Sequence, residues 1–365
     1  MEKLNFRPKV GRSKDISVSA RELAAEPAEL ILGEEICDLE KRLAAWVGVE
    51  HCVAVSDAAS GIALALKAAG IGKGDQVFCA ALGCALPVQG ILMAGAQPVF
   101  VDINPNTYTV DPFCLEYAIS KLRRDHVEMP RALIATDLFG APCHLSELEQ
   151  ICESRGITLI EDMSGAFGAI YRGRILGSFG RFSVASFASP GLLTELGGGA
   201  VFCRSEEDAA RISALRRAGR QQCIDESRIP YIGSADAALA RIRLENLEEE
   251  HLRRRKTAAR YRENLMGKIR VQQMVEGGES VYSQMVVALP KAGIKKQVTK
   301  RLFKMNIPSG PPLCGLQKSC NGWNRAMLIN THSLSDRLLS LPIHPHLSRH
   351  VVDFICESLI TAMED

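Results

Sequence analysis

The sequence predicts an α/β fold: a large domain with a mostly parallel seven-stranded sheet sandwiched by helices, plus a smaller C-terminal α+β domain. The chain has 365 residues, of which 47% are hydrophobic and 24% charged, and this length suits one large globular domain plus a smaller one. Short apolar runs alternate with amphipathic segments, which indicates βαβ units and therefore a parallel sheet. Near residue 270 this alternation stops, which indicates a second domain.

The predicted elements follow in order along the chain. Residues 20–47 carry apolar side chains at helical spacing, and HCVAVS (51–56) is typical of a short buried strand that precedes the helix 62–70. The other strands of the predicted sheet are 76–82, 96–103, 157–162, 181–187 and 199–205, together with a strand and loop at 131–140. Further helices are predicted near 85–95, at 144–156, and between 206 and 265, where ALARIRLENLEEEHLRRRKTAARYRENL is expected to form one long helix. Beyond it, the sequence predicts a strand at 280–289 and helices at 297–307 and 350–363.

The pattern of predicted strands and helices divides the chain into three parts. Residues 1–27 are expected to form an N-terminal arm, 28–255 the large α/β domain and 256–365 the small α+β domain. The boundary is therefore expected inside or just after the long charged helix.

Charge and hydropathy exclude several classes of partner. The net charge is +2, which gives no field that would attract nucleic acid or a membrane surface. The basic run RRRK (253–256) follows LEEEHL, and such alternating blocks are typical of a solvated helix face. The charged start MEKLNFRPKVGRSKD does not resemble a signal peptide, and no apolar run reaches the length of about 18 residues that a membrane span needs. A cytoplasmic protein is expected.

The twelve cysteines do not form a metal or disulfide pattern. No CxxC pair occurs, and histidines and cysteines do not cluster at ligand spacing, so no metal site is expected. Most cysteines lie in apolar runs, as Cys37, Cys52, Cys79, Cys203 and Cys356 do. We expect buried, reduced thiols.

Five segments, in one order, resemble the DegT/StrS-type nucleotide-sugar aminotransferases. The resemblance covers residues 28–363, and its segments are HCVAVSDAASGIALALKAAGIGKGDQVF, AGAQPVFVDINPNTYTVDP, LIEDMSGAFGAIYRGRILGSFGRFSVASF, GGGAVFCRSEEDAARI and LLSLPIHPHLS. It implies the fold-type-I architecture of pyridoxal-phosphate (PLP) enzymes. It also implies an active site between two subunits, and therefore a homodimer.

Some positions match the pattern of that family. Asp162 ends a predicted strand at the carboxyl edge of the sheet and matches the aspartate that pairs with the pyridine nitrogen of PLP. A helix cap or a salt bridge is the alternative role for this carboxylate. Ser186, Phe187 and the glycines 198 and 199 match the frame of the loop that holds the catalytic lysine.

At other positions, this sequence lacks the residue type that the family pattern has. Counting from both sides of the frame places the lysine at Gly191, and no lysine lies between Lys121 and Lys256. Ala59 replaces a phosphate-binding threonine, with Ser60 as the alternative hydroxyl, and the aromatic ring that stacks on the cofactor falls on Cys84. The remaining family positions, a glutamine, a histidine, an asparagine and an arginine, fall on Gly165, Phe167, Ile229 and Tyr231.

Three functions follow from this pattern. The favoured one is a pseudo-enzyme in polysaccharide or amino-sugar biosynthesis that binds a nucleotide sugar or an active relative, as a homodimer or as a heterodimer with an active paralogue. The alternative is a sugar transaminase that binds PLP, or its amine form PMP, non-covalently and without the usual lysine. The third is a different chemistry, with Cys84 as nucleophile and Glu195 as base. The alternative for Cys84 is that its thiol is buried and inert.

Overall fold

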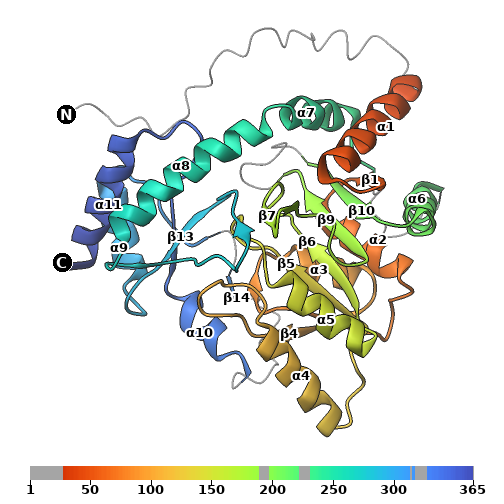
Figure 1. Cartoon of the computed structure of the whole chain (residues 1–365), viewed down its shortest axis with the longest axis horizontal. Helices are drawn as coiled ribbons and strands as arrows, with labels where there is room; N and C mark the ends of the chain where they lie inside the picture. Colours follow the sequence, from red (N-terminus) through yellow and green to blue (C-terminus); the bar gives the residue numbers. More distant parts are fainter. Residues whose placement is uncertain (1–27, 189–196, 222–230, 313–314, 317–326, 365) are drawn as a thin grey trace.

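The computed structural model describes residues 28–188, 197–221, 231–312, 315–316 and 327–364 (Figure 1). Its centre is a seven-stranded sheet in the order β1-β10-β9-β6-β5-β2-β4. The strands are β1 (His51–Val55), β2 (Gln76–Ala80), β4 (Gln97–Val101), β5 (Ala132–Thr136), β6 (Thr158–Asp162), β9 (Phe182–Ser186) and β10 (Gly199–Cys203). Neighbours pair in parallel, except that β10 runs antiparallel to β1 and β9. Each strand overlaps a predicted one, so the predicted fold class is confirmed.

Helices cover both faces of this sheet (Figure 1). They are α1 (Ala28–Val47), α2 (Ala58–Ala68), α3 (Leu86–Met93), α4 (Pro112–Arg124), α5 (Leu145–Arg155), α6 (Glu206–Gln221) and α7 (Ser234–Leu244). Alternate residues of each strand face opposite sides, so that Val53 and Val55 join one apolar cluster and Ala54 another. The first cluster contains residues of α2, α3 and α6, and the second contains residues of α1, α4, α5 and α7.

A third apolar cluster forms the C-terminal part of the molecule. It lies between α8 (Leu247–Leu265), α9 (Lys295–Lys304), α11 (Arg349–Glu364) and a sheet of β11 (Arg270–Val271), β13 (Met285–Ala288) and β15 (Leu338–Leu341). The helix α8 continues across residue 255, so the proposed domain boundary falls inside one helix. The remaining short elements are β3 (Leu82–Gly83), β7 (Ile170–Tyr171), β8 (Arg174–Ile175), β12 (Gly278–Glu279), β14 (Gly315–Leu316) and α10 (Ile329–Ser335).

The prediction of one long charged helix is wrong, because α7 ends at Leu244 and α8 begins at Leu247. Asn246 precedes α8 at its N-cap position but its side chain makes no capping hydrogen bond, whereas Glu248, Glu249 and Glu250 fill the first turn, where acidic residues suit the helix dipole.

The expectation that RRRK lies on a solvated face is wrong for Arg254. Its side chain is buried, because helical spacing places it on the same face as His251, Ala258 and Tyr261. The expectation of buried thiols is likewise wrong for Cys37, which is exposed, whereas Cys52, Cys79, Cys203 and Cys356 are buried. None of the described helices is long and apolar enough to cross a membrane.

Candidate functional site

Asp162 and Ser186 lie together at the carboxyl edge of the sheet. Asp162 ends β6 and pairs in register with Val184, so Ser186 lies two residues further along the neighbouring strand β9. Asp162 is buried, and its Oδ2 accepts a hydrogen bond from Thr136 Oγ1 at 3.3 Å while its Oδ1 accepts one from the Ser164 amide at 3.1 Å. This edge is where open α/β sheets bind ligands, and the structure confirms that Asp162 lies on it.

Burial determines the electrostatics of Asp162. It raises the pKa of this carboxyl, while the hydrogen bonds from Ser164 and Thr136 lower it. Among the residues that the structure describes, Asp162 neither caps a helix nor forms an ion pair, so the alternative roles are not observed. Its strand neighbour Glu161 instead holds a loop, accepting hydrogen bonds from the Gly177 and Phe179 amides and from Ser183 Oγ.

The first turn of α2 contains a residue that sequence reasoning missed. Asp57 is the N-cap, and its Oδ1 accepts a hydrogen bond from the Ser60 amide at 2.8 Å. Its Oδ2 accepts hydrogen bonds from Ser60 Oγ at 2.9 Å and from Ser56 Oγ at 3.0 Å. The hydroxyl of Ser60 is therefore already used inside the protein, and Ala59 beside it has none. An aspartate directly before a helix is an ordinary N-cap signal, which could have identified Asp57.

Cys84 lies close enough to Asp162 for the charge of this carboxylate to act on its thiol. It follows β3 and is partly buried. Burial and the charge of Asp162 raise the pKa of the Cys84 thiol to about 12. The thiolate that a nucleophile needs is therefore scarce at neutral pH. Gly191, Glu195 and Ile229 lie outside the described residues.

We expect Cys84 to be alkylated slowly. A pKa of about 12 lowers the thiolate fraction about a thousandfold relative to an ordinary thiol of pKa about 8.5. Iodoacetamide at pH 7 should modify the exposed Cys37 long before Cys84, as measured by peptide mass spectrometry in a time course. Preferential modification of Cys84 would instead support its role as a nucleophile.

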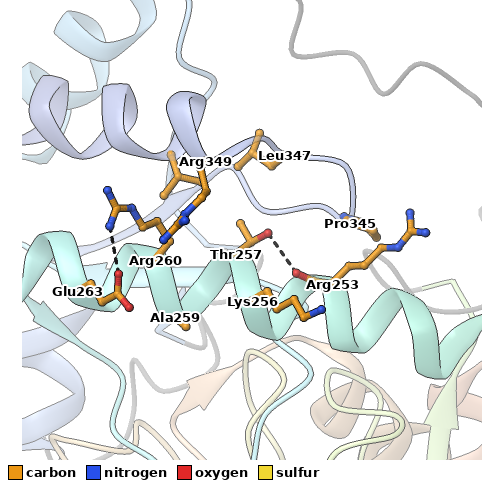
Figure 2. A pocket seen from close by; sticks show the side chains of 10 residues that line it. Arg253, Lys256, Thr257, Ala259, Arg260, Glu263, Pro345, Leu347 and Arg349 are labelled. Atoms are coloured by element: carbon orange, nitrogen blue, oxygen red, sulfur yellow. Dashed lines mark hydrogen bonds and ion pairs between the residues drawn. The ribbon is translucent and has the colours of Figure 1, made fainter.

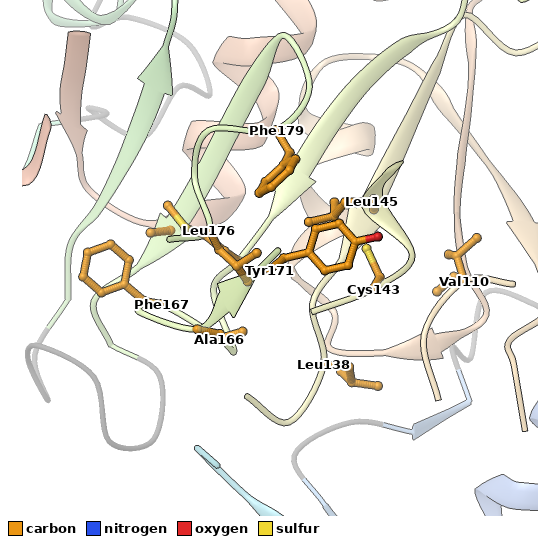
Figure 3. Close-up of a cluster of buried hydrophobic side chains, with 14 of the residues drawn as sticks. Val110, Leu138, Cys143, Leu145, Ala166, Phe167, Tyr171, Leu176 and Phe179 are labelled. Atoms are coloured by element: carbon orange, nitrogen blue, oxygen red, sulfur yellow. The ribbon is translucent and has the colours of Figure 1, made fainter. Parts of the chain in front are cut away.

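Three other positions that the resemblance singles out make packing or hydrogen-bond contacts. The ring of Phe167 is buried and stacks on Trp46, with the ring centroids 4.7 Å apart, and Figure 3 shows it within the apolar core. The Gly165 carbonyl accepts a hydrogen bond from Ser283 Oγ. Tyr231 lies beneath the guanidinium of Arg216, whose Cζ is 5.1 Å from the ring centroid. We infer that Gly165 and Phe167 serve packing.

A cavity of about 520 Å³ lies elsewhere, between α8 and the start of α11 (Figure 2). Four of its ten lining residues are basic, namely Arg253, Lys256, Arg260 and Arg349. Arg260 is already paired, with Asp353 at 2.7 Å and with Glu263 at 3.1 Å. None of the predicted site residues lines this cavity, so it is separate from the candidate site.

A family model described as the DegT/DnrJ/EryC1/StrS aminotransferase family matches residues 14–360. The chain belongs to this family. Its relatives include the UDP-2-acetamido-2-deoxy-3-oxo-D-glucuronate aminotransferase of Pseudomonas aeruginosa, 28% identical over 98% of this chain and 99% of the relative. This finding confirms the resemblance stated from the sequence.

Two solved structures share the fold. A DegT DnrJ EryC1 StrS aminotransferase from Brucella abortus is 29% identical, with a TM-score of 0.81 over 90% of both chains. DesV of S. venezuelae, solved in complex with a ketimine intermediate, is 28% identical, with a TM-score of 0.82 over 95% of this chain and 93% of that one. The fold-type-I architecture is therefore confirmed.

The family implies a PLP cofactor, and the described residues fit it only in part. Asp162 is buried at the expected edge and suits the pyridine nitrogen. The first turn of α2 does not suit the phosphate, because the carboxylate of Asp57 already occupies it and has the same sign of charge. We therefore derive no catalytic step through PLP.

Proposed function

We propose that this family member has lost lysine-dependent PLP catalysis and acts as a pseudo-enzyme that binds a nucleotide sugar or an active relative. The observation that carries the proposal is Gly191 at the position of the catalytic lysine. Glycine has no side chain, so it neither forms an imine nor moves a proton. The occupied first turn of α2 and the protonated Cys84 support the same conclusion.

Nucleotide sugars are the proposed ligand class. Besides the Pseudomonas enzyme, the relatives include a dTDP-3-amino-3,6-dideoxy-alpha-D-galactopyranose transaminase of Aneurinibacillus thermoaerophilus, 28% identical over 90% of both chains. We place this chain in polysaccharide or amino-sugar biosynthesis, in the cytoplasm. We propose a homodimer, or a heterodimer with an active paralogue, because the resemblance implies a site between two subunits.

The absence of a PLP–lysine bond is the first expected result. Purified protein mixed with PLP should show no imine absorbance band. After borohydride reduction, peptide mass spectrometry should find no pyridoxyl group on a specific lysine, with the Pseudomonas aminotransferase as the positive control. A single reduced lysine in high yield would contradict the proposal. Calorimetric titration with UDP- and dTDP-sugars, compared with the free nucleotides, tests the ligand class.

The second candidate is a transaminase that binds PLP or PMP non-covalently. The buried Asp162 at the sheet edge favours it, because this is the one cofactor-binding carboxylate of the family pattern that remains. Amino transfer to a keto sugar, measured with and without added PLP or PMP, decides between the candidates. Turnover that depends on the cofactor supports the transaminase, and turnover no higher than the blank excludes it.

A further inference from the structure

We propose that Asp57 is a built-in anion that takes the place of a ligand phosphate at the N-terminus of α2. It thereby excludes phosphate-bearing groups from this part of the pocket. The inference deepens the proposed function and rests on it in one respect, namely that the carboxyl edge of the sheet still receives a ligand.

At the start of α2, the side chain of Asp57 and a ligand phosphate would compete for the same backbone N–H donors. The first N–H groups of a helix have no partner within the helix, and together with the helix dipole they attract an anion. Asp57 has extended backbone angles (φ −167°, ψ 165°), and its side chain accepts the Ser60 amide at 2.8 Å. The protein therefore supplies its own anion to this turn.

Two serine hydroxyls hold the Asp57 carboxylate in position. Ser56 and Ser60 both donate their hydroxyl hydrogens to Oδ2, at 3.0 and 2.9 Å, and the side chain of Ser60 is buried. No lysine or arginine within the described ranges forms an ion pair with Asp57. The charge is thus balanced only by the helix and by neutral hydroxyls, and a phosphate approaching the same donors meets repulsion at short range.

The backbone around Asp57 is closely packed against Gly199 and Gly197. A Cβ placed on Gly199 would lie 3.1 Å from the Asp57 carbonyl carbon and 3.2 Å from the Ala58 nitrogen. One placed on Gly197 would lie 3.7 Å from the Ser56 oxygen and 4.0 Å from Oδ2 of Asp236, a second carboxyl group. The nearest atoms that these two Cβ atoms would meet are backbone atoms and a carboxylate oxygen, and none of them belongs to a lysine or arginine. The part of a ligand that reaches α2 is uncharged or cationic.

The test compares PLP with pyridoxal, which differ by the phosphate. In the wild-type protein, we expect the two affinities to agree within about threefold. Asp57→Ser keeps a favoured N-cap residue but removes the charge, so it should raise the affinity ratio of PLP to pyridoxal by about tenfold or more. It should also produce measurable binding of inorganic phosphate by calorimetry.

Asp111→Ser is the matched control, because Asp111 caps α4 in the same way, accepting the Phe113 and Cys114 amides at 2.8 and 3.2 Å. It should leave both measurements unchanged. Two results would overturn the inference: wild-type protein that binds PLP about tenfold more tightly than pyridoxal, or an Asp57→Ser variant that is folded by circular dichroism and gains no affinity for phosphate. Borohydride trapping on a lysine tests the proposed function separately, since it reports the imine and not the phosphate.

Discussion

Replacing Phe167 with alanine is expected to lower the free energy of unfolding by about 3–5 kcal/mol. The Phe167 ring is fully buried and stacks on Trp46 of α1, and it also lies 6.3 Å, centroid to centroid, from Phe202 of β10. Alanine would leave a cavity between a helix and the central sheet, and close packing on both sides limits its collapse. Urea unfolding followed by circular dichroism measures the change.

The control for this prediction is Phe113→Ala, because Phe113 is 78% exposed on α4. It should change the free energy of unfolding by less than about 1 kcal/mol. Phe167→His introduces the residue type that the resemblance leads us to expect at this position, and it should also destabilise the protein, since a polar ring would be buried in an apolar cluster. A Phe167→Ala variant as stable as the Phe113→Ala variant would refute the assignment of Phe167 to the core.

The main elements of the fold were predictable because hydrophobic periodicity is a local signal. Buried strands such as β5 and β6 are short apolar runs, and their alternation with helices indicates a parallel sheet. The helix α4 was not predicted, although Asp111 and Pro112 form a typical helix start. The two-residue strand β12 depends on pairing with residues about a hundred positions away, which periodicity does not reveal.

The candidate site was predictable only where its residues end strands. The sequence places Asp162 and Ser186 at the ends of predicted strands, and the structure supplies the strand order and register that bring these ends to neighbouring positions. The closeness of Cys84 to Asp162, and the resulting pKa of its thiol, depend on tertiary structure. From the sequence, the resemblance predicts which polar residues of the family pattern are missing. The structure adds what two of the residues named there do: Phe167 packs in the core and Ser60 helps to hold Asp57.

The structure also explains how Phe167 is linked to the C-terminal part of the chain. His251 of α8 is buried beside the same aromatic group, and a Cβ placed on the intervening Gly168 would lie 2.5 Å from His251 Cε1 and 2.8 Å from the Trp46 ring. Within the described part of the chain, His251 Nε2 has no hydrogen-bond partner. Burial and the charges of Arg254 and Arg255 lower the pKa of His251 to about 3. The imidazole is therefore held neutral at a point where α8 contacts the large domain.

We expect this histidine to make folding sensitive to acid. An unfolded chain binds a proton at His251 below a pH of about 6.5, whereas the folded protein binds one only near pH 3, so the unfolded state carries more protons between these values. The contribution to stability is complete above pH 6.5 and is lost progressively as the pH falls towards 3. Between pH 7.5 and 4 it should decrease by about 3 kcal/mol.

His251→Leu isolates this contribution, because leucine fills the site without titrating. The difference in the free energy of unfolding between wild type and variant should change by about 3 kcal/mol when the pH is lowered from 7.5 to 4. The same comparison with His350→Leu, at an exposed position on α11, is the control for removing a histidine from the surface. If the wild-type and His251→Leu stability curves run parallel over this range, His251 is not buried as a neutral group. The contact that joins α8 to Trp46 would then have to be open to solvent.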